Sequence, residues 1–135
     1  MRETILAQIN AARAAGHVCG TEIMAAVPPM RWNDILFSAA ARHSLDMVAR
    51  NYFSHDTPEG VTFTQRLANE GYSFWAAGEN IAAGQTTVSG VMGAWLSSDG
   101  HCRNIMQPVL NEVAVACVAS SSGYGNTWTM DLGGR

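Results

Sequence analysis

The spacing of apolar positions divides the chain into segments with different expected structures. Over residues 3–15, apolar side chains recur at helical intervals and Gly16 follows as a stop signal, which predicts a first helix. Residues 16–31 contain two glycines and the pair Pro28-Pro29, which do not allow that helix to continue. We therefore expect a loop there, held in place by apolar contacts.

Capping signals and helical spacing predict three further helices. Asn33 or Asp34 can cap the first of them, and Thr62 with Gln65 three residues later forms a capping-box pattern for the second. The third has the clearest helical period in the chain, with apolar residues at i, i+3, i+4, i+7 and i+8. These helices are expected at about 34–51, at 62–69 and at 88–96, the last capped by Thr86 or Thr87.

The remaining patterns are those of strands and turns. Residues 75–82 mix aromatic and small side chains and read as a buried strand, while 112–119 and 126–132 flank a stretch rich in Gly and Ser, as in a closing hairpin. Before this hairpin, a glycine turn at residues 99–100 precedes one or two helical turns that end at Pro108. The prediction is an α+β or three-layer fold, with about four helices around a small, mostly antiparallel sheet.

Composition bounds the class of protein. A length of 135 residues suits a single domain, 1–135, and 47% hydrophobic with 14% charged residues is typical of a folded globular chain. The net charge is −3, all eight positive charges are Arg, and no basic run forms the footprint that nucleic-acid binding needs. No apolar stretch reaches the roughly 20 residues that span a bilayer, so we expect no transmembrane segment.

Three cysteines leave the compartment open. Cys19, Cys102 and Cys117 match no metal-ligand spacing, and they allow one disulfide and one free thiol in three pairings. An exported domain whose signal peptide has been removed, with Met1 supplied for expression, explains the cysteines and the lack of an apolar leader together. The alternative is a cytosolic protein with three buried thiols.

Three polar stretches interrupt the apolar pattern, around His55, Glu79 and His101. A carboxylate inside a strand of Trp, Ala and Ile faces a large desolvation cost, so Glu79 needs a basic or metallic partner, which the two histidines could supply. Such a trio could bind a divalent metal such as zinc, act as acid and base, or form a stabilising hydrogen-bond network. His43 lies on the apolar face of its helix and is expected to be a hydrogen-bonded core residue. A Ser98 nucleophile is not favoured, because no GxSxG turn is present.

Four motifs in order, "NYFSHDTPEG", "GENIAAG", "AWLSSDGHCRNIM" and "WTMDL", resemble the CAP superfamily of cysteine-rich secretory, antigen 5 and pathogenesis-related proteins. More narrowly, the chain is similar to the short bacterial SCP-like extracellular proteins. The resemblance covers nearly the whole chain. It implies an α-β-α sandwich with a three-stranded antiparallel sheet, and a secreted or periplasmic location.

The family's cavity is lined in many members by two His and two Glu. The resemblance places three of these on His55, Glu79 and His101, and in some members the two histidines bind zinc. The second Glu falls on Ser98, which leaves Asp99 as a substitute only if it turns inward. Export also implies a disulfide at Cys102, for which we favour Cys19 over Cys117 as partner.

Three functions follow as hypotheses. The first is a monomeric, non-enzymatic binding module for a metal, or for an apolar or peptide-like ligand. The second is a metal-assisted, protease-like hydrolase that uses Glu79 as a metal ligand or as the base on a metal-bound water. The third is a structural domain with a stabilising polar network. Because Ser98 replaces the second Glu, we favour the binding module.

Overall fold

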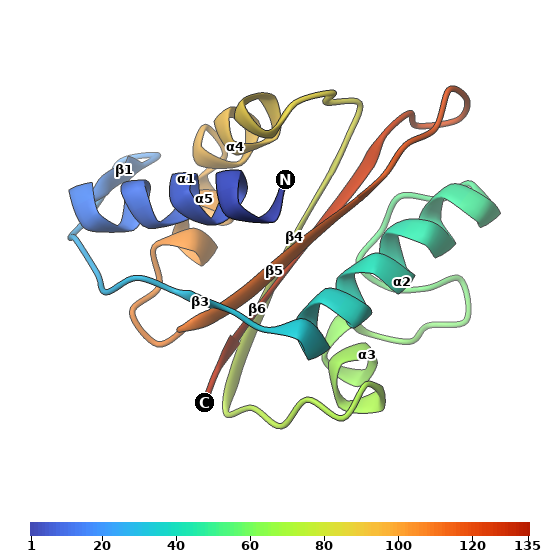
Figure 1. Ribbon diagram of the computed structural model, residues 1–135, viewed down its shortest axis with the longest axis horizontal. Helices are drawn as coiled ribbons and strands as arrows, with labels where there is room; N and C mark the ends of the chain where they lie inside the picture. Colours follow the sequence, from blue (N-terminus) through green and yellow to red (C-terminus); the bar gives the residue numbers. More distant parts are fainter.

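The computed structural model describes all 135 residues as three layers. Figure 1 shows a sheet between α2 and α3 on one side and α1, α4 and α5 on the other. The helices are α1 (Arg2–Ala15), α2 (Asp34–Arg50), α3 (Phe63–Asn69), α4 (Val88–Leu96) and α5 (Asp99–Ile105). The strands are β1 (His17–Cys19), β2 (Glu22–Met24), β3 (Arg31–Trp32), β4 (Ala76–Ala83), β5 (Glu112–Val118) and β6 (Thr127–Gly134). The predicted α+β, three-layer class is confirmed.

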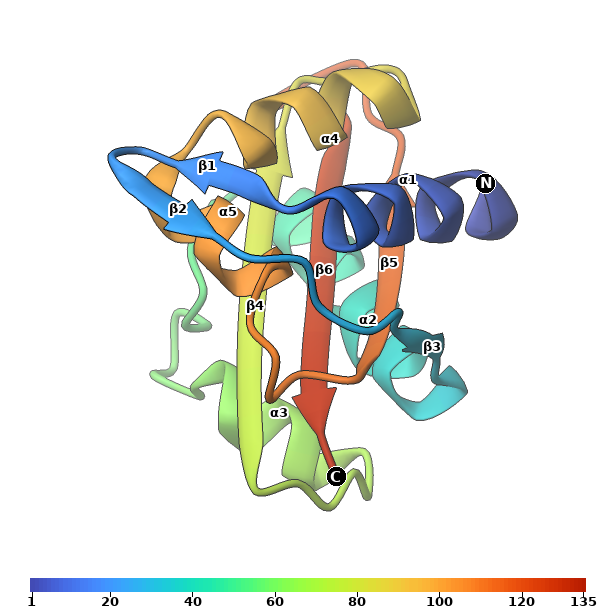
Figure 2. The ribbon, with the colours of Figure 1, turned by 90° about the vertical axis from the view of Figure 1, so that its left-hand side faces the viewer.

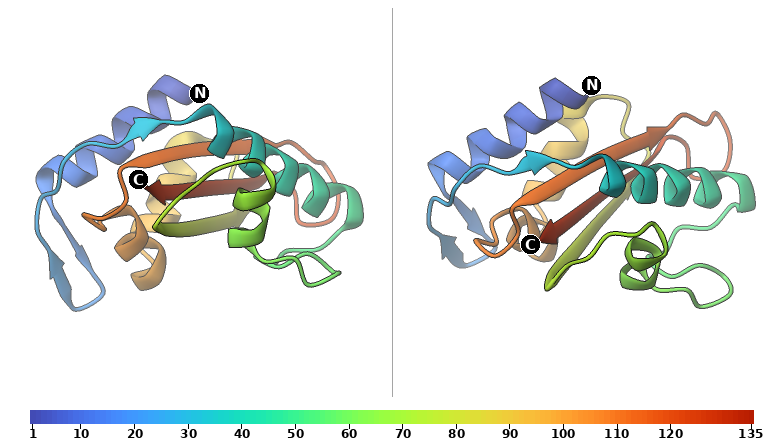
Figure 3. Two further views of the ribbon diagram at one scale, coloured as in Figure 1. Left: turned by 90° about the horizontal axis from the view of Figure 1, so that it is seen from below. Right: turned by 60° about the horizontal axis from the view of Figure 1, so that its bottom comes forward.

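The central sheet has the strand order β3-β5-β6-β4. Its three long strands are antiparallel, as expected, and the two-residue β3 adds a parallel pairing to β5. Figure 2 shows β4 beside β6 at one edge of this sheet, and β1 and β2 form a separate hairpin. Figure 3 shows from below how α2 and α3 lie along one face while α1 and α4 cover the opposite face.

The register of β4 on β6 fixes where each backbone and side-chain group points. The Gly84 N–H donates to the Asn126 carbonyl at 2.8 Å, and the pairing of Ala83 with Thr127 continues this ladder. Even-numbered residues of β4 therefore use their N–H and C=O groups on β6, while those of odd-numbered residues point to the free edge. The Glu79 pair with Asp131 is consequently a non-hydrogen-bonded pair, the kind in which facing side chains lie closest.

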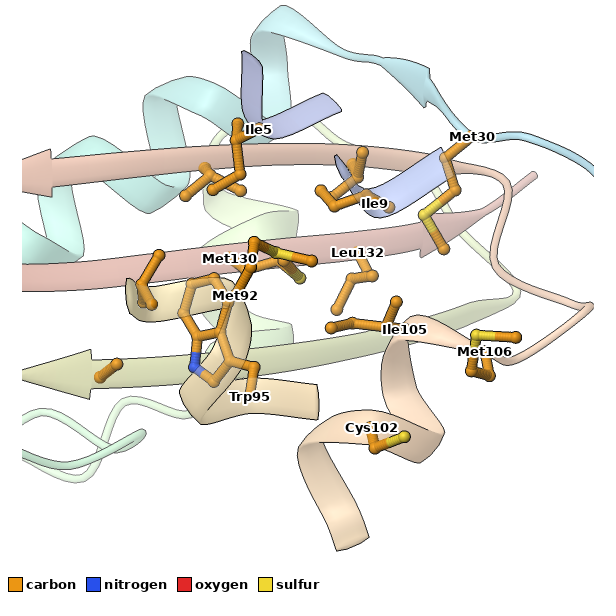
Figure 4. Close-up of a cluster of buried hydrophobic side chains, with 14 of the residues drawn as sticks. Ile5, Ile9, Met30, Met92, Trp95, Cys102, Ile105, Met106, Met130 and Leu132 are labelled. Atoms are coloured by element: carbon orange, nitrogen blue, oxygen red, sulfur yellow. The ribbon is translucent and has the colours of Figure 1, made fainter. Parts of the chain in front are cut away.

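Two apolar cores fill the space between the layers. The larger core joins the sheet to α1, α4 and α5, and Figure 4 shows Ile9, Trp95, Ile105 and Met130 within it. The smaller core, between the sheet and α2 and α3, contains Leu36, Ala39, Leu67, Tyr72 and Ala114. Residues of one strand alternate between these cores, which is the period of two expected of a sheet covered on both faces.

The capping predictions are confirmed for three helices. Asn33 accepts from the Leu36 N–H, Thr62 and Gln65 form the reciprocal capping box of α3, and Thr87 caps α4. Each cap satisfies a backbone donor that has no partner within its helix.

Three expectations need correction. Residues 16–31 are not only a loop, because β1 and β2 form a hairpin that turns at Gly20. There are five helices rather than four, since residues 99–100 open α5 instead of making a turn before it. The buried strand expected over residues 75–82 begins at Ala76, and Trp75 is 66% exposed, unlike the buried Trp95 and Trp128.

The favoured disulfide pairing is confirmed. Cys19 and Cys102 are bonded, with their Cα atoms 5.5 Å apart, and they join the β1–β2 hairpin to α5. Cys117 is free and partly buried in β5. Burial raises the pKa of its thiol, so it stays protonated at neutral pH.

Candidate functional site

Glu79 stands at the centre of the polar site. It lies in β4 facing α2 and α3, and its side chain is completely buried. One nitrogen of Arg66, Nη2, donates to both Glu79 carboxylate oxygens at 2.8 Å, and His55 Nδ1 lies 2.9 Å from Oε1. The predicted basic partner is therefore present, but it is an arginine from α3 together with one histidine.

Arg66 also holds the segment that carries His55. Its Nη2 donates to the His55 carbonyl at 2.9 Å, and the Arg66 side chain is only 11% exposed. Arg66 sits one turn inside the helix that Thr62 and Gln65 cap. The cap, the arginine and the carboxylate together set the position of the His55 ring.

Asp131 adds a second carboxyl group beside Glu79. It faces Glu79 from β6, is completely buried, and no donor reaches either of its carboxylate oxygens. Burial, and then the negative charge of Glu79, raises the pKa of Asp131 well above its usual range. We assign the shared proton to Asp131, whose hydroxyl then donates to Glu79.

The pKa of Glu79 changes in the opposite direction from that of Asp131. Burial alone would raise the pKa of Glu79, but the hydrogen bonds from Asp131 and His55 and the charge of Arg66 outweigh it and lower that pKa. Glu79 is thus ionised, and Arg66, His55 and Asp131 all act as hydrogen-bond donors to its carboxylate.

His55 lines an open pocket of about 520 Å³. Its side chain is 46% exposed, and its ring centroid lies 6.5 Å from that of Phe63. Because the Nδ1 atom faces a carboxylate, the neutral ring carries its proton there and leaves the Nε2 lone pair free. The pocket is lined by His55, Asp56, Thr62, Phe63, Thr64, Ala77, Gly78, Glu79 and Asn104.

His101 is placed differently from the other two predicted site residues. It lies in α5, no hydrogen bond joins it to His55 or Glu79, and it does not line the pocket of His55. Its backbone carbonyl accepts a hydrogen bond from Asn80 Nδ2 at 3.1 Å. Burial, and then the charge of His55, lowers the pKa of His101, which favours the neutral ring.

Neither Ser98 nor Asp99 replaces the second Glu of the family's cavity. Ser98 precedes α5 without a side-chain capping bond, and no hydrogen bond or ion pair joins Asp99 to the site. The Asp99 carboxylate lies instead against Gly20, where a Cβ atom would come within 2.3 Å of its Oδ2. It therefore faces the hairpin turn and not Glu79.

Comparison with known proteins shows the family to which this chain belongs. The profile of the family described as "CAP: Cysteine-rich secretory protein family" matches residues 6–132. The chain belongs to the CAP family. Over 107 residues, 79% of the chain, this CAP domain is 36% identical to the uncharacterized protein YkwD of Bacillus subtilis, and it spans 40% of that protein. It is 32% identical over 77 residues to the uncharacterized membrane protein YlbC of the same organism, covering 57% of the chain and 22% of YlbC.

Solved structures of similar proteins share the fold. An extracellular protein containing an SCP domain from Bacillus anthracis is 27% identical with a TM-score of 0.75, covering 99% of this CAP domain and 41% of that chain. An outer surface protein of Borrelia burgdorferi has a TM-score of 0.80 at 18% identity, covering 98% of this CAP domain and 91% of that chain. The CAP domain thus spans well under half of the two Bacillus subtilis proteins and of the Bacillus anthracis chain.

Sequence reasoning missed two residues of the site. Arg66 lies in a short helix, where the sequence predicts only that an arginine is a charged surface residue. Asp131 had a signal that was available, because it is a carboxylate within a run of apolar strand residues, just as Glu79 is. His43, in contrast, was correctly expected in the core, where it is 1% exposed and its Nε2 lies 2.8 Å from the Ser54 carbonyl.

Proposed function

We propose that this chain is a non-enzymatic, extracytoplasmic binding module whose pocket beside His55 takes a peptide-like ligand. Its CAP family membership supports this, as does the extracellular SCP-domain protein of Bacillus anthracis that it resembles. No helix in the chain has the length and apolar character needed to cross a bilayer.

The state of Glu79 carries the choice of binding over hydrolysis. A general base needs an accessible lone pair and a pKa close to the working pH. Glu79 has a lowered pKa, Arg66 bridges both its oxygens, and His55 occupies Oε1 as well. The carboxylate is therefore engaged in holding the pocket wall and is not free to take a proton from water.

The pocket lining combines polar groups with apolar surface, which suits a peptide-like ligand. Only Phe63 and Ala77 of the nine lining residues are apolar. His55, Asp56, Thr62, Thr64 and Asn104 offer imidazole, carboxylate, hydroxyl and amide groups, which match the donors and acceptors of a peptide. Phe63 gives one apolar surface against which a side chain could pack.

A pool-based binding experiment tests this proposal. A positional-scanning library of acetylated, amidated hexapeptides is added to ¹⁵N-labelled protein at about 1 mM, a concentration that detects even weak complexes. We expect some pools to shift the amide signals of pocket residues. Thr64→Trp should fill the exposed pocket rim and abolish those shifts, while Thr64→Ala leaves the pocket open and retains them. No shift with any pool refutes the proposal.

Metal binding is a second candidate, favoured by the free Nε2 of His55 and the neutral ring of His101. No three His, Cys, Asp or Glu side chains are grouped so as to hold an ion. Arg66 already satisfies both Glu79 oxygens, so Glu79 does not fit the role of a ligand. A metal site would need His55, His101 and solvent as ligands.

Zinc titration calorimetry tests this second candidate. Stoichiometric binding that both His55→Ala and His101→Ala abolish, and that Glu79→Gln only weakens, supports a two-histidine site. Such weakening is the size expected when a carboxylate orients a metal-binding histidine, about 10- to 100-fold. Zinc binding that survives either histidine substitution excludes it.

A further inference from the structure

We propose that the ligand of the His55 pocket is an extended peptide that adds a strand to the free edge of β4 at Ala77 and Glu79. This inference rests on the proposed peptide-binding function and specifies how the peptide is held. β4 ends the central sheet, and part of its outer edge forms one wall of the pocket.

The free edge of β4 presents a short row of unpaired backbone groups. The register directs the N–H and C=O groups of Ala77 and Glu79 away from β6. No protein group bonds the Ala77 N–H, the Ala77 C=O or the Glu79 N–H. Along the edge these groups run donor, acceptor, donor, which is a pattern that a neighbouring strand can pair with.

Farther along β4, the same edge is already occupied. Asn104 Nδ2 donates to the Glu79 carbonyl at 3.3 Å, and Trp95 Nε1 donates to the Ile81 carbonyl at 3.1 Å. These two side chains end any added ladder at Glu79. The protein thus protects the rest of an edge that would otherwise invite uncontrolled pairing, and leaves open the part that borders the pocket.

The walls of the pocket suit the side chains of an added strand. Successive side chains of a strand point to opposite faces, so one set would face Phe63 and Thr64 of α3 and the other would face α5. Gly78 has no side chain on the α5 face, where Asn104 also lines the pocket. The walls that the added strand would meet are therefore α3 on one face and Asn104 of α5 on the other.

Charge selects among peptides. Arg66 balances the charge of Glu79, whereas Asp56 makes no ion pair and is exposed on the pocket rim. The uncompensated carboxylate favours a peptide with a basic side chain. A second copy of this chain, pairing β4 with β4, is the competing occupant and is an outcome of the test below.

Amide hydrogen exchange of the ¹⁵N-labelled protein is the first measurement. Without peptide, the amides of Ala77 and Glu79 should exchange faster than those of Gly78 and Asn80, which are bonded to β6. A hexapeptide pool with a basic residue should slow the Ala77 and Glu79 amides at least about tenfold. The same peptides are then N-methylated either at all odd or at all even positions. The set that loses the N–H groups facing β4 should bind about tenfold more weakly, and the other set should bind normally.

A protein variant gives the matching test. Ala77→Pro removes an N–H that β6 does not use, and proline is tolerated on an edge strand when its missing donor faces outward. Peptide affinity should fall about tenfold with an unchanged thermal midpoint, while Ala77→Ser keeps both. If Ala77→Pro does not fold, the N-methyl series decides the question.

The outcomes separate the two proposals. Peptides that bind at Phe63 and Thr64 without protecting Ala77 and Glu79 overturn strand addition and leave the proposed function standing. Absence of binding by every pool overturns both. Fast exchange that becomes slow with protein concentration alone, together with dimers in sedimentation, shows that a second copy covers the edge and also overturns the peptide proposal.

Discussion

Asp131→Asn should stabilise the protein at neutral pH, although it replaces a completely buried residue. Asp131 faces Glu79 across β4 and β6 and has no donor for an ionised carboxylate. Folding therefore requires Asp131 to take up a proton that it releases on unfolding. Asparagine has the same shape, carries no charge, and can donate its amide to Glu79 without that proton.

The size of the effect follows from linkage. A raised native pKa means that the folded state binds the extra proton, so this group's contribution is complete below the unfolded pKa of about 3.9 and declines as the pH rises. The decline is about 1.4 kcal/mol per pH unit until the native pKa is reached. Relative to the wild type, the variant should therefore gain about 1 kcal/mol between pH 4 and pH 5, and more at neutral pH.

Glu79→Gln is the matched control, because it removes a carboxylate from the opposite position of the same ladder. Here the expected change in the free energy of unfolding has the opposite sign. The change leaves Arg66, 11% exposed, without its anion, and loss of one partner of a buried ion pair costs about 3–5 kcal/mol. One neutralisation thus stabilises the fold and the other destabilises it.

Urea unfolding followed by tryptophan fluorescence, at pH values from 4 to 7, measures both variants. The difference between the wild type and Asp131→Asn isolates the proton on Asp131, because the other titrating groups are common to the two proteins. An Asp131→Asn protein that is less stable than the wild type by the same amount at every pH would refute the assignment of the proton.

Three further predictions concern stability. Replacing Cys19 and Cys102 by alanine opens a link across 83 residues and should cost about 4.5 kcal/mol by the loop-entropy relation, seen as a lower urea midpoint; reduction of the wild type should reproduce it. Thr62→Ala removes the cap of α3 and should cost about 1 kcal/mol, whereas Thr62→Ser should cost little. Trp95→Phe loses the bond to the Ile81 carbonyl in the larger core and should lower the thermal midpoint by an amount equivalent to about 1–3 kcal/mol.

Sequence patterns predicted the parts of the fold whose causes are local. The Thr62 and Gln65 capping box and the apolar period of residues 88–96 depend on neighbours within one turn, and both elements appear where expected. The hairpin of residues 17–24 was missed because its exposed Ile23 and Val18 give no alternation. That hairpin is held by the disulfide to α5, a contact made 83 residues away.

The site was predictable only in part for a similar reason. Glu79 could be expected to need a partner because its neighbours are apolar, and His55 was found through the resemblance of its motif. Nothing local to Arg66 shows that the short helix α3 brings its side chain to the Glu79 carboxylate. The pairing of Glu79 with Asp131 depends on the β4–β6 register, which the distance between them along the chain does not reveal.

Because several side chains contact Glu79, the hydrolase hypothesis needs a test other than replacing Glu79 itself. Arg66, His55 and Asp131 come from α3, from the segment before it and from β6, so one carboxylate ties three parts of the chain together. Glu79→Gln would loosen all three contacts, and a loss of peptide hydrolysis in that variant could arise from the displaced His55 ring as readily as from a missing base.

Asp131→Asn keeps Arg66, His55 and the Glu79 carboxylate in place. If Glu79 were the base, any hydrolysis by the Asp131→Asn protein would still rise with pH only in the acidic range where Glu79 ionises, because its pKa is lowered. A rate that instead rises through neutral pH would assign the proton transfer to a different group.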